Sequence, residues 1–408
     1  MNGLPSVSVV VVNYRRAEDT IACLKALRDD VDYPAELVRL VCVDNSEDPD
    51  QAARIAAAVP EAVLVETGHN HGFAGGCNRG VERATGEIIG FLNSDARPHP
   101  RWVAAAVEVF RADRRIASVA SKVLDWDGAT IDYAGAAVSW FGMGFKPGNG
   151  SPDGPGFDRQ KDVLFGTGSA MFVRAEEYRA VGGFDERFFM FFEDVDLGWR
   201  LNLRGHRVRY EPASIAYHRH HASMAGAGEF REQYLLERNA LMLLYKNLER
   251  STLDRVLPAA LALAVRRGTG RGEVDPDQFE LARRGDGDDL PTTAVPKVAL
   301  APLLAIDRFV EALPELHAAR AVEQHHRVRS DADLRPLMGD VDEPLVGSVP
   351  YLLAHRAIAR AFAVDDALDG PRRADLRFAT RYLAAGGPVR LARRAAGRLL
   401  RRYGLRRS

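Results

Sequence analysis

The stretch SVSVVVVNYRR, residues 6–16, decides the fold class of this chain of 408 residues. Residues 7–12 form a β-branched run, which is typical of a strand buried on both faces of a sheet. Residues 17–27 follow with Ile21, Leu24 and Leu27 at helical spacing. A buried strand that leads directly into an amphipathic helix indicates an α/β protein with a parallel sheet.

The alternation of strands and helices continues to about residue 125. We expect further strands at residues 38–43, 62–66, 88–92 and 116–123, and helices at 50–58 and 102–110. The glycine-rich segment 68–80 is expected to form a turn that leads into a short helix. Function in such sheets lies at the carboxyl ends of the strands, so the polar residues there are the candidate site. These residues are Asn13 and Tyr14, then Asp44, Asn45 and Ser46, then Asn93, Ser94 and Asp95.

The composition excludes several classes of protein. Lys+Arg is 55 and Asp+Glu is 56, and a formal net charge of -1 argues against a protein that coats nucleic acid. A hydrophobic fraction of 46% is enough for a sizeable core and excludes a disordered chain. Cys23, Cys42 and Cys77 lack CxxC spacing, which excludes a disulfide framework and fits a reducing compartment. No apolar stretch reaches the roughly 18 residues of a spanning helix, so we expect a cytoplasmic protein, at most peripheral on the inner face of the plasma membrane.

The rest of the chain divides by composition. Residues 126–160 are rich in Gly, Pro and Asp and are expected to form a long loop, followed by a strand at 164–173. The expected regions are an α/β domain (1–228), a helical segment that packs on it (229–265), a polar linker (266–296) and an α-helical C-terminal region (297–408).

The C-terminal tail, residues 388–408, contains eight arginines and no acidic residue. Apolar residues are interleaved with the arginines, so a basic amphipathic helix on an anionic membrane surface is one interpretation. A solvated helix that packs on the α/β domain, or on a second copy of the chain in a homodimer, is the other. The sequence leaves both open.

Asp95 ends a buried strand, where a charge is costly unless something neutralises it. A hard divalent cation held by oxygen ligands is one solution. An Asx turn that leaves the strand is the other, and the Asn93-x-Asp95 pattern alone favours the turn.

Three acids, Glu193, Asp194 and Asp196, follow five bulky apolar residues. Acids in the first turn of a helix cap its free amides, which accounts for Glu193 or Asp196. A carboxylate against apolar surface can have its pKa raised toward the range of a general base, and Asp194 is the candidate. Arg200 follows Asp196 at helical spacing, which predicts a structural ion pair.

His218, His220 and His221 follow an expected strand at residues 214–217. A histidine at a strand end can ligate a metal ion or be a polar residue at the rim of the site. Zinc is disfavoured because no cysteine lies nearby. The glycine-rich segment lacks the spacing of a dinucleotide fingerprint, and no GKS or GKT occurs, which argues against dehydrogenases and P-loop enzymes.

Six motifs in order resemble the family 2 glycosyltransferases, and especially their rhamnosyltransferase-like branch. They are VVVVNY, VDNS, NHGFAGGCNRG, GEIIGFLNSD, the segment from GTGSAMFVRAEEYRAVGGFDERFFMF to FEDVDLGWR, and a later histidine. The match covers roughly residues 5–250. The resemblance implies a GT-A fold, that is, a mixed and mostly parallel Rossmann-like sheet flanked by helices, with an α-helical C-terminal extension.

The resemblance also implies the reaction. A sugar would move with inversion from a nucleotide-diphosphate sugar to a hydroxyl of a saccharide or polyprenol-linked acceptor, as in polysaccharide or cell wall biosynthesis, with no nucleic acid as partner. Mg²⁺ or Mn²⁺ would stabilise the leaving group. The phenyl side chains of residues 188–192 would exclude water.

Residue roles carry over by position. For the donor, the resemblance implies Asn13, Tyr14, Asp44, Asn45, Gly75, Gly76, Asn78, Asn93, Ser94 and Asp95. It implies Asp95 and His218 as metal ligands and Asp194 as the general base. For the acceptor, it implies Gly168, Ser169, Glu193 and Trp199.

Two positions depart from the family pattern. Asn93 stands where the DxD motif has its first Asp, as is frequent in the rhamnosyltransferase-like branch. Cys77 stands where other branches carry an Arg that contacts the diphosphate, which argues against those branches.

Two other functions are the alternatives. A nucleotidyltransferase acting on sugar phosphates would need a glycine-rich, basic phosphate loop after the first strand, and residues 13–16 contain no glycine. The protein could instead be an inactive sugar-binding or scaffold protein, but the presence of both Asp95 and Asp194 argues against this alternative.

Overall fold

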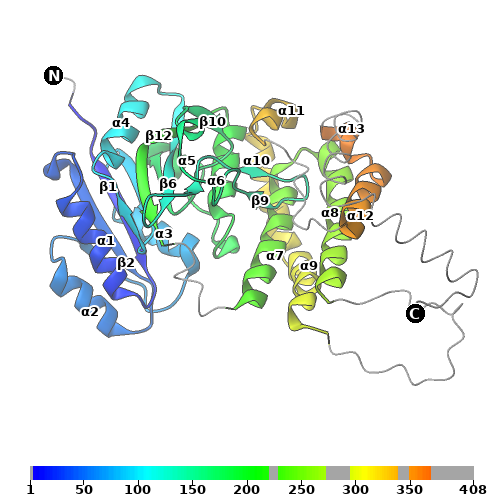
Figure 1. Ribbon diagram of the computed structural model, residues 1–408, viewed down its shortest axis with the longest axis horizontal. Helices are drawn as coiled ribbons and strands as arrows, with labels where there is room; N and C mark the ends of the chain where they lie inside the picture. Colours follow the sequence, from blue (N-terminus) through cyan, green and yellow to red (C-terminus); the bar gives the residue numbers. More distant parts are fainter. Residues whose placement is uncertain (1–2, 220–227, 273–294, 339–348, 369–408) are drawn as a thin grey trace, which may run out of the picture.

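The structure is a computed structural model that describes residues 3–219, 228–272, 295–338 and 349–368. Its centre is a 10-stranded mixed sheet (Figure 1). Eight of these strands follow the order β10-β12-β6-β11-β4-β1-β2-β3, and the other two, β5 and β7, pair with β12 and β6. A small second sheet pairs β8 with β9. The strands are β1 (Val7–Asn13), β2 (Val38–Asp44), β3 (Val63–Glu66), β4 (Ile88–Leu92), β5 (Ala96–Pro98), β6 (Ile116–Asp125), β7 (Ile131–Tyr133), β8 (Ala137–Val138), β9 (Gly144–Phe145), β10 (Lys161–Val163), β11 (Ala170–Arg174) and β12 (Arg207–His218).

Helices cover both faces of the sheet, which is why β1 is hydrophobic on both sides. Val9 and Val11 belong to the core under α1 and α4, whereas Val10 belongs to the core under α3, α5 and α6. The helices of this part are α1 (Ala17–Asp29), α2 (Pro49–Ala58), α3 (Gly72–Glu82), α4 (Trp102–Ala112), α5 (Ala175–Ala180) and α6 (Glu193–Leu203). The expected α/β class, with a mixed sheet flanked by helices, is confirmed.

The strand register brings the polar strand ends together. Parallel pairing of β1 with β2 places Asn13 opposite Asp44. Antiparallel pairing of β11 with β4 places Ala170 opposite Leu92, so the residues before β11 lie next to Asn93. Pairing of β12 with β5 places His218 opposite Ala96, beside Asp95.

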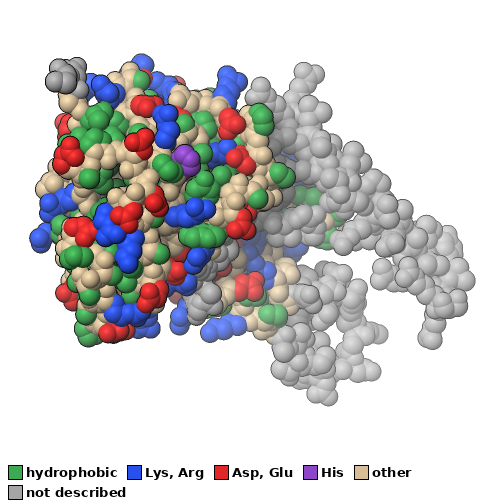
Figure 2. Space-filling model, turned by 60° about the vertical axis from the view of Figure 1, so that its left-hand side comes forward, with side chains coloured by type: hydrophobic (Ala, Val, Ile, Leu, Met, Phe, Trp, Pro, Cys, Tyr) green, Lys and Arg blue, Asp and Glu red, His purple; other side chains and the backbone are tan. Residues whose placement is uncertain are grey.

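A helical region follows the sheet in the chain and lies to its right in Figure 1. Its helices are α7 (Glu229–Asn247), α8 (Arg250–Arg271), α9 (Ala301–Glu311), α10 (Leu313–His325), α11 (Asp331–Leu334), α12 (Val349–Ala361) and α13 (Val364–Leu368). None of the described helices is both long and apolar enough to cross a bilayer. The face drawn in Figure 2 carries acidic and basic side chains interspersed, in agreement with the near-zero net charge.

Residues 139–143 lie between the sheet and the helical region. The Trp140 Nε1–H donates to His355 Nε2 of α12 (3.1 Å), and the Arg267 guanidinium of α8 stacks over the Phe141 ring. Gly142 has φ +86°, and a Cβ there would lie 2.5 Å from the Ala240 carbonyl oxygen of α7. Backbone and side chains of this segment therefore pack directly on three helices.

Four expectations about local structure are wrong. The glycine-rich segment is mostly the helix α3, because Gly76 and Gly80 let that helix lie directly on the valines of β1. The expected loop 126–160 contains β7, β8 and β9, and the strand expected at 164–173 is only β11. The expected linker starts later, because α8 runs to Arg271. His220, His221 and the tail 388–408 lie outside the described residues, and the division into domains stays a prediction.

Candidate active site

Asp194 lies in the first turn of α6, where the helix dipole favours a carboxylate. Its Oδ2 accepts the Gly168 N–H at 2.7 Å and its Oδ1 accepts the Val195 N–H at 2.8 Å. Burial raises the pKa of Asp194, although these two N–H groups and the charge of Lys146 act in the opposite direction. A carboxylate with a raised pKa and a fixed orientation suits a general base.

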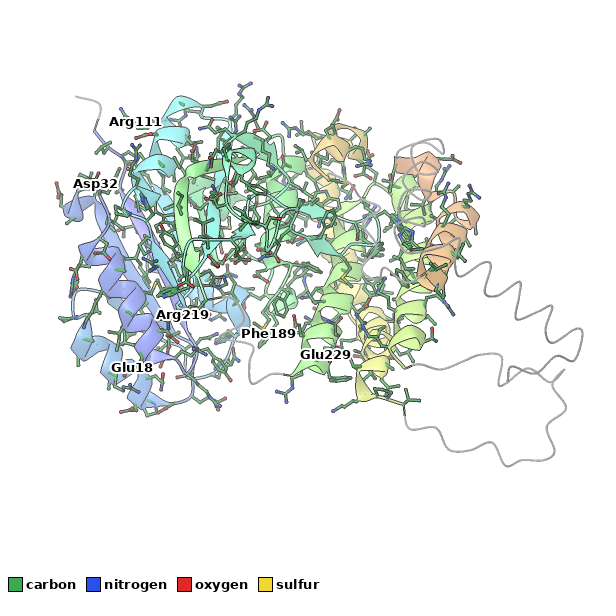
Figure 3. All side chains as sticks on the ribbon, in the orientation of Figure 1. Glu18, Asp32, Arg111, Phe189, Arg219 and Glu229 are labelled. Carbon is green, nitrogen blue, oxygen red and sulfur yellow. The ribbon has the colours of Figure 1, made fainter. Side chains whose placement is uncertain are left out.

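The backbone that leads into Asp194 is strained. Phe189, Phe191 and Phe192 have φ of 65°, 66° and 69°, a conformation that non-glycine residues rarely adopt. Each such residue costs about 1–3 kcal/mol and persists only when its surroundings hold it. We call residues 188–192 the aromatic loop. Figure 3 shows Phe189 beside α3, whose Ala74 N–H donates to the Phe189 carbonyl (3.1 Å).

Asp95 is buried, and neither of its carboxylate oxygens accepts a hydrogen bond by the usual geometric criteria. Its one described polar contact is with His218, whose Nε2 lies 3.2 Å from Asp95 Oδ1. Burial opposes ionisation of Asp95, but the contact with His218 outweighs it, so the pKa of Asp95 is lowered. An ionised carboxylate is thus held in the interior with nearly all of its acceptor capacity unused.

His218 connects Asp95 to a second buried acid. Its Nδ1 lies 2.9 Å from Asp132 Oδ2, and Asp132 Oδ1 accepts from Lys146 Nζ at 2.7 Å. Burial alone would lower the pKa of His218, but Asp132 and Asp95 raise it to about 9. These two carboxylates therefore favour a proton on His218, and a divalent cation bound at Nε2 would take the place of that proton.

This donor set fits Mg²⁺ or Mn²⁺. Asp95 offers unused buried oxygens, and His218 has Nε2 toward Asp95 and Nδ1 toward a carboxylate, as metal-ligating histidines do. No group of three potential His, Cys, Asp or Glu ligands occurs among the described residues. A site with few protein ligands suits a cation that takes its other ligands from substrate phosphates and water.

The candidate donor residues at the ends of β1 and β2 form a buried hydrogen-bonded set. Asn13 Nδ2 donates to Asp44 Oδ1 at 2.8 Å, and Ser46 Oγ donates to the same oxygen at 2.9 Å. Tyr14 is 40% exposed, which leaves its ring accessible for stacking on a planar ligand. Arg15 lies over that ring and has φ of 57°.

The other candidate donor residues have structural contacts. Asn45 Nδ2 donates to the Gly72 carbonyl at 2.8 Å, so it fixes the start of α3. The Asn78 amide bonds to Phe184 and Glu186, which ties α3 to the segment before the aromatic loop. A Cβ on Gly76 would lie 2.9 Å from Val12, so this glycine is needed for packing. Gly75 likewise has a packing reason, because a Cβ there would lie 2.7 Å from His71 Cβ.

The metal side and the base side of the candidate site adjoin. The Asn93 N–H donates to the Ser169 carbonyl at 3.0 Å, and Gly168, the preceding residue, donates to Asp194. A Cβ at Gly168 would lie 3.0 Å from the Phe73 ring of α3 and 3.6 Å from Asp194 Oδ2. Ser94 lies between Asn93 and Asp95 and is partly exposed. The carboxylate of Asp194 is therefore two short contacts from the turn that carries Asp95.

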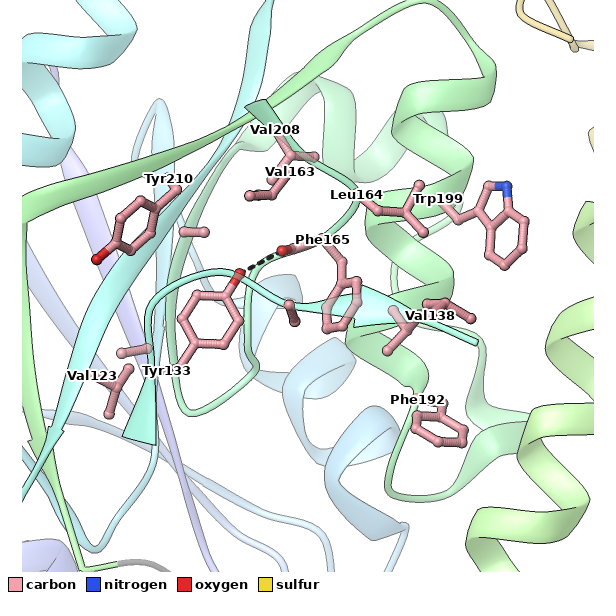
Figure 4. Packing of buried hydrophobic residues seen from close by; sticks show 14 of the residues in the cluster. Val123, Tyr133, Val138, Val163, Leu164, Phe165, Phe192, Trp199, Val208 and Tyr210 are labelled. Atoms are coloured by element: carbon pink, nitrogen blue, oxygen red, sulfur yellow. Dashed lines mark hydrogen bonds between the residues drawn. The ribbon is translucent and has the colours of Figure 1, made fainter. Parts of the chain in front are cut away.

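The residues expected to contact an acceptor separate into two groups. Gly168 and Ser169 lie beside Asp194, with the Ser169 hydroxyl 3.0 Å from Thr167 Oγ1. Glu193 is 5% exposed, and burial, with the neighbouring Asp194, raises its pKa well above the ordinary value. Trp199 is 1% exposed and packs in the core near Leu164 (Figure 4), so its expected contact with an acceptor does not fit this structure.

Comparison with known proteins shows what part of the chain resembles. Residues 8–162 match the family model described as "Glycosyl transferase family 2". This segment runs from β1 through β4 and includes the turn that carries Asp95. It is 31% identical over 217 residues to the O-antigen biosynthesis protein RfbC of Myxococcus xanthus, which covers 51% of this chain but 17% of that protein.

A second relative is named as a rhamnosyltransferase. The N-acetylglucosaminyl-diphospho-decaprenol L-rhamnosyltransferase of Mycobacterium tuberculosis (strain CDC 1551 / Oshkosh) is 28% identical over 210 residues, which are 46% of this chain and 68% of that protein. Among solved structures, GalNAc-T7 with UDP, GalNAc and Mn²⁺ has a TM-score of 0.51 at 14% identity, and the match covers 68% of this chain and 54% of that chain. At this identity the likeness shows the fold alone.

Three residues of this candidate site were not predicted from the sequence. Asp132 and Lys146 lie in the segment that was expected to be a loop. Asp132 contacts His218, whereas Lys146 contacts Asp132 and lowers the pKa of Asp194 by its charge. Asn239 on α7 donates to carbonyls of the aromatic loop. Asp132 lies in a strand of three residues and Asn239 lies within a long helix, so neither follows a recognisable buried strand in the sequence, and only the three-dimensional contacts reveal them.

Proposed function

We propose that this protein is a metal-dependent, inverting glycosyltransferase that moves a sugar from a nucleotide-diphosphate sugar to a hydroxyl of a saccharide or lipid-linked saccharide. The observation that carries the proposal is the proximity of two carboxylates in different surroundings, Asp95 buried and Asp194 partly buried. Asp95 has unused oxygens beside His218, whereas Asp194 has a raised pKa and two fixed N–H donors.

The donor end of the site is supported by the strand ends. Tyr14 offers an exposed ring for the nucleotide base, and buried Asp44 is oriented by Asn13. Asp95 and His218 would hold Mg²⁺ or Mn²⁺, which when bound offsets the charge of the diphosphate leaving group. Asp132 keeps the His218 ring in the orientation that presents Nε2.

At the acceptor end, Asp194 takes the proton of the attacking hydroxyl at its carboxylate. Its raised pKa makes the carboxylate a better proton acceptor than an ordinary aspartate. One displacement without a covalent intermediate inverts the configuration at the anomeric carbon, and such carbons pass through an oxocarbenium-like transition state. The half-buried rings of Phe189 and Phe191 lie next to Asp194 in the chain and would limit access of water.

The decisive experiment is a thermal-shift panel of nucleotide sugars with Mn²⁺ or Mg²⁺, followed by transfer assays with the donor that binds. A donor at about one hundred times its Kd adds about 2.7 kcal/mol of stability, which raises Tm by several degrees. Asp95→Asn keeps the size and shape of the side chain, including an oxygen that can face His218, so the variant should fold, and it should lose the metal-dependent shift. Asp127→Asn, an exposed position in the turn after β6, is the matched control and should keep the shift.

The proposal fails if no nucleotide sugar stabilises the wild-type protein with either cation. It also fails if the shift given by Asp95→Asn equals that of the wild type and is insensitive to EDTA. Release of pyrophosphate from a nucleoside triphosphate and a sugar phosphate would instead indicate a nucleotidyltransferase.

A further inference from the structure

The aromatic loop, residues 188–192, needs an external support. Phe189, Phe191 and Phe192 all have φ between 65° and 69°, and the loop ends directly at the first turn of α6. L-residues adopt such angles only where their surroundings fix them. The contacts of the loop carbonyls show what fixes them.

Asn239 of α7 makes most of these contacts. Its side chain is completely buried, and Nδ2 donates to the carbonyls of Phe188 (3.0 Å), Met190 (2.9 Å) and Phe191 (2.7 Å). The two N–H groups of this amide thus lie within hydrogen-bond distance of three carbonyls of a five-residue loop, and of these three the Phe188 carbonyl also accepts from Arg238. Buried carbonyls without a donor would be costly, so the loop depends on this amide.

Arg238 fixes the orientation of the Asn239 amide. Arg238 Nε donates to Asn239 Oδ1 at 2.9 Å, and because a guanidinium only donates, the NH₂ group of the amide must face the loop. Arg238 Nη2 also donates to the Phe188 carbonyl at 2.9 Å. The remaining side of the loop lies on α3, through the Ala74 N–H and the close approach of Gly72 to Phe189.

We propose that Asn239 is a positioning residue of the transfer reaction: it holds the aromatic loop in its strained form and thereby sets Asp194 against the acceptor hydroxyl. The inference rests on the proposed function, because it assigns Asp194 as the base. It places α7 in the working active site, although Asn239 lies outside residues 8–162 that match the family profile.

The test compares Asn239→Leu with Asn202→Leu in the full chain. Asn202 is an ideal control because it is also buried, donates from Nδ2 to backbone carbonyls such as that of Leu164 (2.9 Å), and accepts from an arginine, Arg329. Asn202 lies in the later part of α6, and its amide contacts the carbonyls of Val163, Leu164 and Gly198 rather than the aromatic loop. Leucine keeps the size of asparagine and removes the donor in both variants.

Two readouts separate positioning from general stability. Hydrogen exchange over residues 187–195 should speed up at least tenfold in Asn239→Leu and stay unchanged in Asn202→Leu, measured below both unfolding transitions. The kcat of Asn239→Leu should fall by about 10- to 100-fold, the range expected for a small misplacement of a reacting group. Donor KM should stay within about twofold, because the metal side of the site does not contact Asn239. Asn202→Leu should keep wild-type kcat.

Each result decides the inference. Unchanged exchange in Asn239→Leu would show that the loop does not depend on this amide, and faster exchange with wild-type kcat would refute the positioning role. A wild-type protein without transfer would refute the proposed function instead, while the exchange data still decide whether Asn239 holds the loop. If Asn239→Leu does not fold, Arg238→Met removes the orienting donor and should lower kcat in the same direction, and an unchanged kcat there would overturn the proposal.

Discussion

Asp194→Asn is the substitution that tests the chemistry most directly, and the structure gives its expected cost in stability. Asparagine has one acceptor oxygen, so either the Gly168 N–H or the Val195 N–H loses its partner. A hydrogen bond to a charged group is worth about 1.5–3 kcal/mol. Burial already disfavours the ionised carboxylate, as its raised pKa indicates, and removal of the charge offsets part of this loss. We expect a net loss of about 1–2 kcal/mol, which lowers Tm by several degrees and leaves the protein folded.

The effect on transfer should be much larger than the effect on stability. Loss of a general base lowers kcat by about 10²- to 10⁴-fold, which corresponds to about 2.7–5.5 kcal/mol in the activation barrier. Single-turnover transfer with saturating donor and acceptor measures this step, and calorimetry with the donor measures binding. Donor affinity should remain within about twofold of the wild type, because the donor side is built on Asp95, Tyr14 and Asp44.

The pH dependence gives an independent check. Asp194 accepts a proton only when it is ionised, and burial raises its pKa, so kcat/KM should fall as pH drops through a value above that of an ordinary aspartate. Because Glu193 titrates next to it, the measured value belongs to the pair. The acid limb should disappear in Asp194→Asn. A kcat within threefold of the wild type, or an unchanged acid limb, would show that another group is the base.

Three further substitutions test other parts of the site. Lys146→Met removes a positive charge that lowers the pKa of Asp194, so the acid limb of the kcat/KM profile should move to higher pH. An acid limb that stays in place or moves to lower pH would contradict this. Trp199 is buried, so Trp199→Phe should lower the free energy of unfolding by about 1–3 kcal/mol and leave the acceptor KM unchanged. A several-fold rise in the acceptor KM would show that Trp199 does contact the acceptor. Gly80→Ala should destabilise the protein by about 1–3 kcal/mol in a thermal melt, because its Cβ would lie 2.4 Å from a β1 valine. The control Gly270→Ala has open space around it and should not destabilise the protein. Equal melting temperatures of the two variants would argue against tight packing of α3.

The sequence predicts the strand ends well for a physical reason. A buried parallel strand must be an apolar run, and the polar residues after it must meet at one edge of the sheet. Asn13, Asp44 and Asp95 follow this rule, and the parallel pairing of β1 with β2 and with β4 confirms their common edge. The ion pair of Asp196 with Arg200, predicted from helical spacing, is present at 2.7 Å.

Residues that depend on distant contacts could not be predicted in this way. Asp132 lies in a segment without periodicity, and its partner His218 is 86 residues away. A helix was expected after the glycine-rich segment, but its start at Gly72 was not, because six glycines in and near α3 lower the local helix propensity. The close packing of α3 on β1 outweighs this propensity. The burial of Trp199, by contrast, follows from local spacing. Trp199 is four residues from both Val195 and Leu203, which places the three side chains on one buried helix face.

The segment 139–143 limits how this protein can be recombined with its relatives. Trp140 is bonded to α12, and the backbone at Gly142 touches α7, while Lys146, shortly after, reaches Asp132 beside His218. In a chimera that exchanged only the C-terminal helices, residues 139–143 would contact helices of a different protein. We expect this mismatch to disturb the metal side of the site. We expect functional hybrids only when residues 139–143 and the three helices that they contact, α7, α8 and α12, come from the same parent protein.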